Sequence, residues 1–168
     1  MIIYLTGFMA AGKSHLAEQI ARAADLTSID LDREIEIFTG NSIAEIFESR
    51  GEAGFRKLES QHLSYISRHN KNFVMACGGG VMADTDNIML MQQYGIIVFV
   101  DTDLNTIIKR LTSDSTNRPL ISGLKSEEIK QKVGQLYKQR LPHYRKADIA
   151  YNPARESVED LLYKIKLF

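Results

Sequence analysis

The sequence has little cysteine and no excess of charge of either sign. Cys77 is the one cysteine in 168 residues, so the chain cannot form an internal disulfide, as is typical of proteins in a reducing compartment. Lysine plus arginine and aspartate plus glutamate both number 21, so no overall positive field favours binding to nucleic acid or to an anionic membrane. We therefore expect neither as a partner.

Long apolar runs and internal divisions are also missing. No segment approaches the roughly 20 apolar residues that a membrane-spanning helix needs, and the apolar stretch 1–5 lacks the basic residues of a secretion signal. These absences predict a cytoplasmic protein. No repeat, low-complexity tract or polar linker divides the sequence, so we expect one domain over residues 1–168. Because no large apolar face is left unexplained, we expect a monomer.

Apolar runs that are typical of buried strands alternate with helical patterns. The expected strands are 2–6, 27–30, 73–77, 96–101 and 148–151, and the clearest helices are 13–24, 103–111, 126–140 and 157–166. This alternation predicts an α/β fold, in which helices cover both faces of a parallel sheet.

Two segments depart from this alternation. Residues 31–68 have the pattern of consecutive helices broken near Gly40 and Gly51, with Ser42 and Glu45 placed to form a capping box. A helical insertion of this kind often supplies a substrate pocket. Residues 112–123 are polar and without a clear period, so we expect a mobile loop there.

Residues 7–14, Gly-Phe-Met-Ala-Ala-Gly-Lys-Ser, fit the pattern G-x-x-x-x-G-K-[ST] between an expected strand and an expected helix. In such a loop the backbone N–H groups surround phosphate oxygens, and the helix N-terminus adds a favourable dipole. We expect Lys13 to reach the β- and γ-phosphates and the Ser14 hydroxyl to ligate Mg²⁺. The loop predicts a nucleoside-triphosphate site without indicating what receives the phosphoryl group.

Candidate residues for the acceptor follow two other expected strands. In an extended chain the carboxylates of Asp30 and Asp32 project to the same face, toward the mouth of the phosphate loop. One carboxylate then holds Mg²⁺ through water while the other orients an acceptor hydroxyl; the alternative is that one of them caps the next helix. The run Gly78–Gly80 follows the strand 73–77, where its backbone can approach a ligand closely, although a bare triple glycine also fits a flexible turn.

Three arginines stand out by position: Arg56, Arg118 and Arg140. Arginine holds a carboxylate or phosphate through a planar two-pronged contact. Spacing alone does not separate these three from ordinary surface charges.

Taken in order, these elements resemble the shikimate kinase family over nearly the whole chain. The matching segments are GFMAAGKS, SIDLDREIE, SIAEIFESRGEAGFRKLE, ACGGGV, NRPL and QRLPHYRKAD. The resemblance implies a three-layer α/β/α fold similar to nucleoside-monophosphate kinases, with a five-stranded parallel sheet. It also implies transfer of the ATP γ-phosphoryl group to the 3-hydroxyl of shikimate, in aromatic amino-acid biosynthesis.

The resemblance further implies roles for individual residues. The implied catalytic residues are Lys13, Asp32 and Arg118, with Arg118 on a closing lid over residues 112–123. Ser14 and Asp30 are implied to hold Mg²⁺, the one cofactor. The implied shikimate-binding residues are Asp32, Arg56, Glu59, Gly78, Gly79, Gly80 and Arg140, with Arg56 and Arg140 on the carboxylate. The implied ATP-binding residues are Gly7, Ala10, Ala11, Gly12, Lys13, Ser14, His15, Arg110, Arg118 and Pro153, of which Arg110 and Pro153 flank the adenine.

The sequence departs from the family pattern at three positions. Ala10 replaces a common glycine, which restricts the backbone unless φ is negative there. Cys77 stands where many members have a threonine or serine, so a hydroxyl that can bind a metal-bound water is missing. His15 replaces a threonine or serine, and we expect its side chain to be exposed.

Two other functions remain open. One is a different small-molecule kinase, such as a gluconate kinase, although the combined D-x-D, FR-x-x-E, GGG and R-x-P-x-Y set favours shikimate. The other is a nucleotide-binding regulator without turnover, against which the intact Lys13, Asp32 and three arginines speak.

Overall fold

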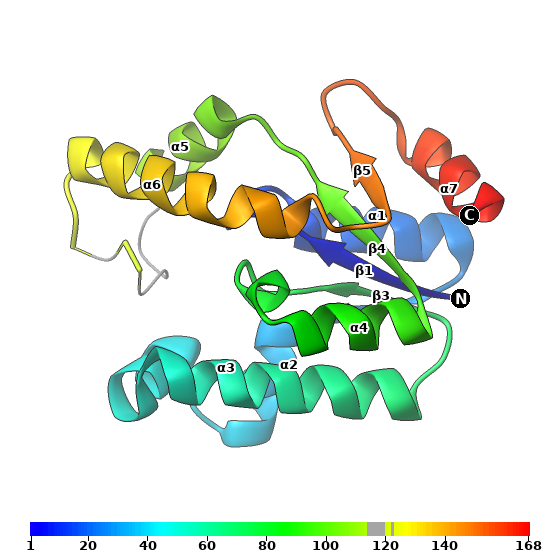
Figure 1. Ribbon diagram of the computed structural model, residues 1–168, viewed down its shortest axis with the longest axis horizontal. Coiled ribbons are helices and arrows are strands. Elements are labelled where there is room, and N and C mark those ends of the chain that lie inside the picture. Colours follow the sequence, from blue (N-terminus) through cyan, green and yellow to red (C-terminus); the bar gives the residue numbers. More distant parts are fainter. Residues whose placement is uncertain (114–119, 122) are drawn as a thin grey trace.

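The computed structural model, which describes residues 1–113, 120–121 and 123–168, contains a five-stranded parallel sheet between two layers of helices (Figure 1). The strands are β1 (Ile2–Thr6), β2 (Thr27–Asp30), β3 (Phe73–Ala76), β4 (Ile96–Val100) and β5 (Ile149–Tyr151). They lie in the order β2-β3-β1-β4-β5, and every neighbouring pair is parallel. The predicted α/β architecture and its five strands are confirmed.

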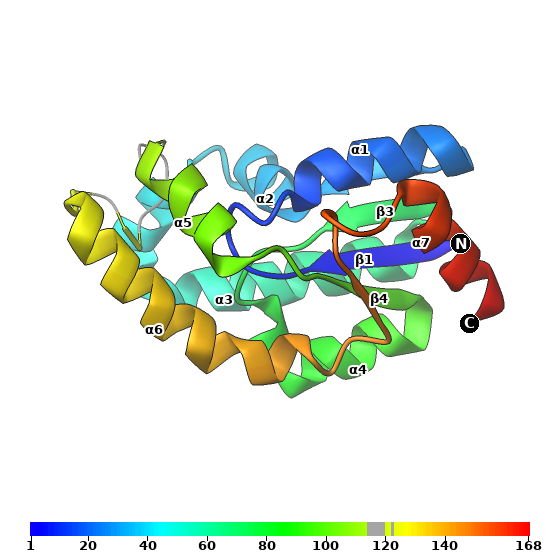
Figure 2. The same cartoon turned by 90° about the horizontal axis from the view of Figure 1, so that it is seen from above.

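The two helical layers are seen from above in Figure 2. Helices α1 (Lys13–Ala24) and α7 (Val158–Leu167) cover one face, and α3 (Ile43–His69), α4 (Thr85–Tyr94) and α6 (Ser126–Tyr144) cover the other. Helix α2 (Leu31–Thr39) packs on α3, and α5 (Leu104–Ser113) packs on α6.

The central strand β1 shows why the sheet is buried on both faces. Its side chains alternate between the faces, so Ile3 and Leu5 pack in the core under α1 and α7, whereas Tyr4 packs in the core on the opposite side. All three side chains have no exposed surface. A continuous apolar run is therefore what this strand requires.

The predicted helical insertion is α2 followed by α3. Gly40 ends α2 with φ 67°, and Gly51 interrupts α3 with φ 67°, so both predicted breaks are confirmed. The capping box is also present, because the Glu45 N–H donates to Ser42 Oγ at 3.3 Å and the Ser42 N–H donates to Glu45 Oε2 at 2.7 Å.

Two short elements had no counterpart among the sequence predictions, the 3₁₀ helix η1 (Val81–Ala83) and helix α4. Helix α4 buries the polar Asn87 beside Ile88 and Met91, so its apolar stripe is weak.

Helix α5 continues to Ser113, and the predicted loop 112–123 therefore begins inside a helix. In the part of the chain that the structure describes, no helix is both long and apolar enough to cross a membrane.

The sheet topology places a crevice at the carboxyl end of β1. The connection from β1 leads to β2 and β3 on one side of it, and β4 and β5 lie on the other side. In parallel sheets, ligands bind where the strand order changes direction in this way.

Candidate active site

The phosphate loop joins β1 to α1 and needs glycine at both ends. Gly7 has φ 136°, and a Cβ atom there would lie 2.9 Å from the Val100 carbonyl oxygen; Gly12 has φ 100°. Within the described chain, α1 has no side-chain cap and no acidic residue in its first turn. Its first N–H groups are therefore open to an anion, as the sequence pattern predicts.

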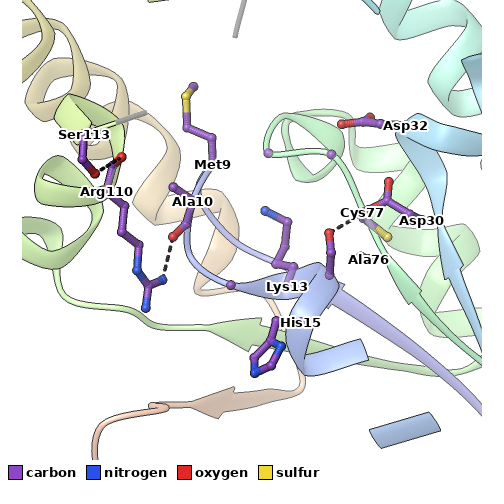
Figure 3. Close-up of a pocket in the computed structure, with 14 residues that line it drawn as sticks. Met9, Ala10, Lys13, His15, Asp30, Asp32, Ala76, Cys77, Arg110 and Ser113 are labelled. Carbon is purple, nitrogen blue, oxygen red and sulfur yellow. Dashed lines mark hydrogen bonds between the residues drawn. The ribbon is translucent and has the colours of Figure 1, made fainter. Parts of the chain in front are cut away.

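Side chains from three parts of the chain hold this loop. The Lys13 ammonium donates to the carbonyl oxygens of Gly7 and Phe8, both at 2.9 Å. From beyond β4, the buried Thr102 hydroxyl donates to the Ala11 carbonyl at 2.7 Å. From α5, Arg110 donates to the Ala10 carbonyl at 2.8 Å, and Figure 3 shows it reaching across to the loop. The loop is therefore held in shape by protein contacts alone.

Ala10 has a left-handed backbone, with φ 58°. Alanine is unrestricted at this position only if φ is negative, and the structure does not meet that condition. A Cβ atom in this region crowds the following carbonyl, at a cost of roughly 1–2 kcal/mol. The hydrogen bonds on the carbonyls of Ala10 and Ala11 keep the residue there.

The geometry predicted for Asp30 and Asp32 was wrong, although both side chains line the phosphate-side cavity. The strand β2 ends at Asp30, and Asp32 lies in the first turn of α2, so the two residues are not in extended chain. Asp30 is the N-cap of α2 and accepts from the Arg33 N–H at 3.3 Å. The capping interpretation thus holds for Asp30, and it leaves the second oxygen, Oδ2, to accept from the Ser14 hydroxyl at 2.6 Å.

Asp32 lies across the cavity from the phosphate loop (Figure 3). Its Oδ1 atom is buried and has no hydrogen-bond partner in the described residues. Burial and the neighbouring Asp30 raise the pKa of this carboxyl, and Lys13 and Arg56 oppose the rise. A half-buried carboxylate that lines the cavity and has an oxygen without a protein partner is suited to accept a proton or a hydroxyl hydrogen bond from a ligand.

The acceptor-side residues all pack against the triple glycine. A Cβ atom on Gly78 would lie 2.1 Å from Glu59 Oε1, and one on Gly80 would lie 2.4 Å from Arg56 Cζ. Gly79 faces Arg140, whose Nη1 would lie 3.5 Å from such a Cβ. A side chain at position 78 or 80 would displace a charged group, which is why the alternative of a flexible turn does not describe this segment.

Arg56 and Glu59 form an ion pair within α3. Arg56 Nη1 lies 2.7 Å from Glu59 Oε2, and its Nη2 lies 3.3 Å from Glu52 Oε1. The Glu59 side chain is fully buried, and its Oε1 has no hydrogen-bond partner among the described residues. Burial raises the pKa of Glu59 while Arg56 opposes the rise. Glu59 thus lies behind Arg56 and fixes the direction of its guanidinium.

Arg140 reaches the same place from α6. Its Nη1 donates to the Gly79 carbonyl at 3.2 Å, and its Cζ lies 5.9 Å from the centre of the Phe8 ring. Both arginines line a cavity of about 1160 Å³ that continues from the phosphate-side cavity of about 570 Å³. Seven residues line both cavities: Met9, Ser14, Asp30, Asp32, Ala76, Gly78 and Gly79. The arrangement can hold a phosphate donor and an anionic acceptor side by side.

The residues at the junction fit a magnesium ion. Ser14 and Asp30 offer hydroxyl and carboxylate oxygens, the hard donors that Mg²⁺ prefers. The described residues contain no cluster of three or more histidine, cysteine, aspartate or glutamate side chains that could hold a metal. Mg²⁺ is commonly held by one or two protein ligands together with water and substrate phosphates, so this small donor set is sufficient.

Some predicted site residues lie away from the two cavities or outside the described part of the chain. Arg118 is not among the described residues. Pro153 lies in an exposed turn after β5 and is not among the described residues that line the two cavities. His15 is exposed, as expected. Cys77 is buried, with its thiol 3.9 Å from the Met75 carbonyl.

Thr102 was not predicted from the sequence, because nothing in the pattern around it indicates a contact 91 residues away.

Comparisons with known proteins identify the family. The shikimate kinase family model matches residues 9–167. A shikimate kinase of Sulfurihydrogenibium sp. (strain YO3AOP1) is 36% identical over 168 residues, which cover 98% of this chain and 97% of that protein. The crystal structure of shikimate kinase from Bacteroides thetaiotaomicron has a TM-score of 0.86 at 32% identity, covering 99% of this chain and 95% of that chain. For shikimate kinase from Acinetobacter baumannii in complex with shikimate the TM-score is 0.87 at 35% identity, covering 98% of this chain and 90% of that chain. The family model and these full-length similarities show that the chain belongs to the shikimate kinase family.

Proposed function

We propose that this protein transfers the γ-phosphoryl group of ATP to the 3-hydroxyl group of shikimate, giving shikimate 3-phosphate and ADP. The observation that carries the proposal is that Asp32 lines both cavities, with the phosphate loop along one and the pair Arg56 and Arg140 along the other. Membership of the family and the shikimate complex of the Acinetobacter baumannii enzyme support the choice of acceptor.

The acceptor is held by two guanidinium groups on one side and by a carboxylate on the other. Arg56 and Arg140 bind the shikimate carboxylate, because guanidinium groups match a carboxylate with two parallel hydrogen bonds. Glu59 keeps Arg56 in place. Asp32 accepts the hydrogen bond of the 3-hydroxyl and takes its proton when the new phosphate ester forms.

The donor is held by the phosphate loop. The backbone N–H groups at the start of α1 bind the phosphates, and Lys13 neutralises charge on the β- and γ-phosphates. The migrating phosphoryl group passes through a loose transition state, so positioning and charge neutralisation matter more than strong base catalysis by Asp32. Arg110 and Pro153 flank the adenine; Arg118, which the family resemblance implies on the phosphates, lies outside the described residues.

Ser14 and Asp30 are the residues that would hold Mg²⁺. When bound, the ion supplies charge neutralisation at the β- and γ-phosphate oxygens. Since the Ser14 hydroxyl and Asp30 Oδ2 lie 2.6 Å apart, the two oxygens are available at one place.

ADP release by the purified protein tests the proposal. With MgATP we expect turnover that depends on shikimate, stops with EDTA and is nearly absent in Lys13→Ala. Gluconate is the control acceptor, because it offers a carboxylate and hydroxyls on an open chain. Turnover with gluconate and not with shikimate would contradict the acceptor; substantial activity of Lys13→Ala would contradict the phosphate-loop assignment.

A further inference from the structure

The Gly79 carbonyl oxygen accepts two hydrogen bonds from helix α6. One donor is Arg140 Nη1 at 3.2 Å, and the other is the Tyr144 hydroxyl. The two donors are four residues apart, so they project from the same side of the helix. Tyr144 is only 1% exposed, and its ring stacks on Phe99 with centroids 5.3 Å apart and an angle of 19° between the rings. Its hydroxyl therefore has a fixed position relative to the sheet.

This contact sets the direction of the peptide that joins Gly79 to Gly80. The peptide is trans, as are all peptide bonds in the described chain, so the Gly80 N–H points opposite to the Gly79 carbonyl. Holding the carbonyl toward α6 therefore turns the N–H away from α6. No residue that the structure describes accepts a hydrogen bond from this N–H, and Gly80 lines the larger cavity. The donor is thus left without a protein acceptor at the wall of the cavity.

Gly79 also lies against the phosphate loop. A Cβ atom on it would lie 3.3 Å from the Met9 backbone nitrogen and 3.6 Å from the Gly7 carbonyl oxygen. A shift of this segment would change the spacing between the phosphate-side cavity and the acceptor cavity, both of which Gly79 lines. Phosphoryl transfer depends strongly on that spacing.

We propose that Tyr144 is a positioning residue that fixes the Gly78–Gly80 segment relative to the phosphate loop. Its hydroxyl also keeps the Gly79 carbonyl hydrogen-bonded when Arg140 turns to the acceptor carboxylate. The proposal rests on the proposed function for the acceptor. A carbonyl oxygen has two lone pairs, so Tyr144 satisfies it while the guanidinium takes a new partner. Without the hydroxyl, Arg140 would have to leave a half-buried carbonyl unbonded in order to bind substrate, which is unfavourable.

The hydroxyl remains a donor over the working pH range. Burial raises the pKa of Tyr144 to about 12, so the group is protonated at neutral pH. The positive charges of Arg140 and Arg56 act in the opposite direction. The hydrogen bond to Gly79 therefore does not depend on the pH of the assay between mildly acidic and mildly basic conditions.

The variant Tyr144→Phe removes the hydroxyl and keeps the stacked ring. Tyr4→Phe is the matched control, because Tyr4 is also fully buried in the same core and donates to Ser67 Oγ at 2.8 Å, away from the cavities. In steady-state kinetics we expect Tyr144→Phe to raise the KM for the acceptor roughly fivefold or more, with a smaller change in the KM for ATP. Tyr4→Phe should lose similar stability and keep wild-type kinetics.

Amide hydrogen exchange of residues 77–83 gives a readout that does not need the acceptor. Two backbone bonds in this segment, from the Val81 N–H to the Gly78 carbonyl and from the Ala83 N–H to the Gly80 carbonyl, should open faster in Tyr144→Phe and not in Tyr4→Phe. If wild type fails to use shikimate, the proposed function fails, and the exchange result still decides the role of Tyr144. Equal exchange and equal kinetic effects for the two variants would overturn the proposal.

Discussion

The substitution Ala10→Gly should stabilise the protein, because it removes a Cβ atom from a left-handed backbone in the phosphate loop. Ala10 has φ 58°, a conformation that costs a residue with a Cβ roughly 1–2 kcal/mol. Glycine avoids this cost but adds about 0.4–1 kcal/mol of conformational entropy to the unfolded chain. Ala10 is also partly buried against the core, so losing its methyl group takes back a fraction of about 0.8 kcal/mol. The net expected gain in the free energy of unfolding is about 0.5 kcal/mol.

The neighbouring Ala11 provides a control of opposite sign. It is not among the positive-φ residues of the described chain, and its side chain is 2% exposed in the core under α1 and α7. Ala11→Gly therefore gains nothing from backbone relief, adds the same unfolded-state entropy and loses a buried methyl worth about 0.8 kcal/mol. We expect it to destabilise the protein by about 1–2 kcal/mol.

Urea unfolding of the two variants and the wild type measures the difference. The two substitutions should move the midpoint in opposite directions with unchanged slope. Thermal unfolding should agree, since about 1 kcal/mol shifts the Tm of a protein of this size by roughly 2–4 °C. Equal destabilisation by both variants would refute the claim that Ala10 is strained.

Three further predictions concern the acceptor site and the insertion. Asp32→Asn should lower kcat by about 100-fold or more while circular dichroism shows an unchanged fold; an unchanged kcat would make Asp32 a structural residue only. Arg140→Ala should raise the KM for shikimate about 10- to 100-fold with little change in the KM for ATP, and an equal rise in both would count against a dedicated carboxylate contact. Glu45→Gln should destabilise the protein at pH 7 and have no effect in acid. The reason is that hydrogen bonds from Ser42 lower the pKa of Glu45, so its contribution is present above its ordinary pKa and disappears as the pH falls through the lowered value. Urea midpoints at both pH values check this.

The phosphate loop could be predicted because its function depends on local backbone geometry. Glycine positions and the lysine within a short segment determine the shape of the loop, and the flanking strand and helix followed from their apolar patterns. The conformation of Ala10 could not be predicted, since alanine ordinarily avoids positive φ. It depends on hydrogen bonds from Arg110 and Thr102, which are distant in sequence.

The acceptor side could be predicted by residue type and less well by geometry. Whether Asp32 is extended or helical depends on where β2 ends, and the sequence does not mark that point within two residues. Glu59 appears in a charged stretch of helix, yet its side chain is fully buried, because α3 packs against the triple glycine. The contacts that require glycine at positions 78 and 80 come from that packing, which periodicity does not reveal.

Phosphorus NMR of a reaction containing MgATP and shikimate is the decisive experiment for phosphoryl transfer to the acceptor, because it follows the transferred group itself. We expect a new phosphomonoester resonance that grows in proportion to ADP and does not form without shikimate. Release of inorganic phosphate in place of that resonance, or consumption of ATP that does not depend on shikimate, would contradict the claim that this site transfers a phosphoryl group to the acceptor.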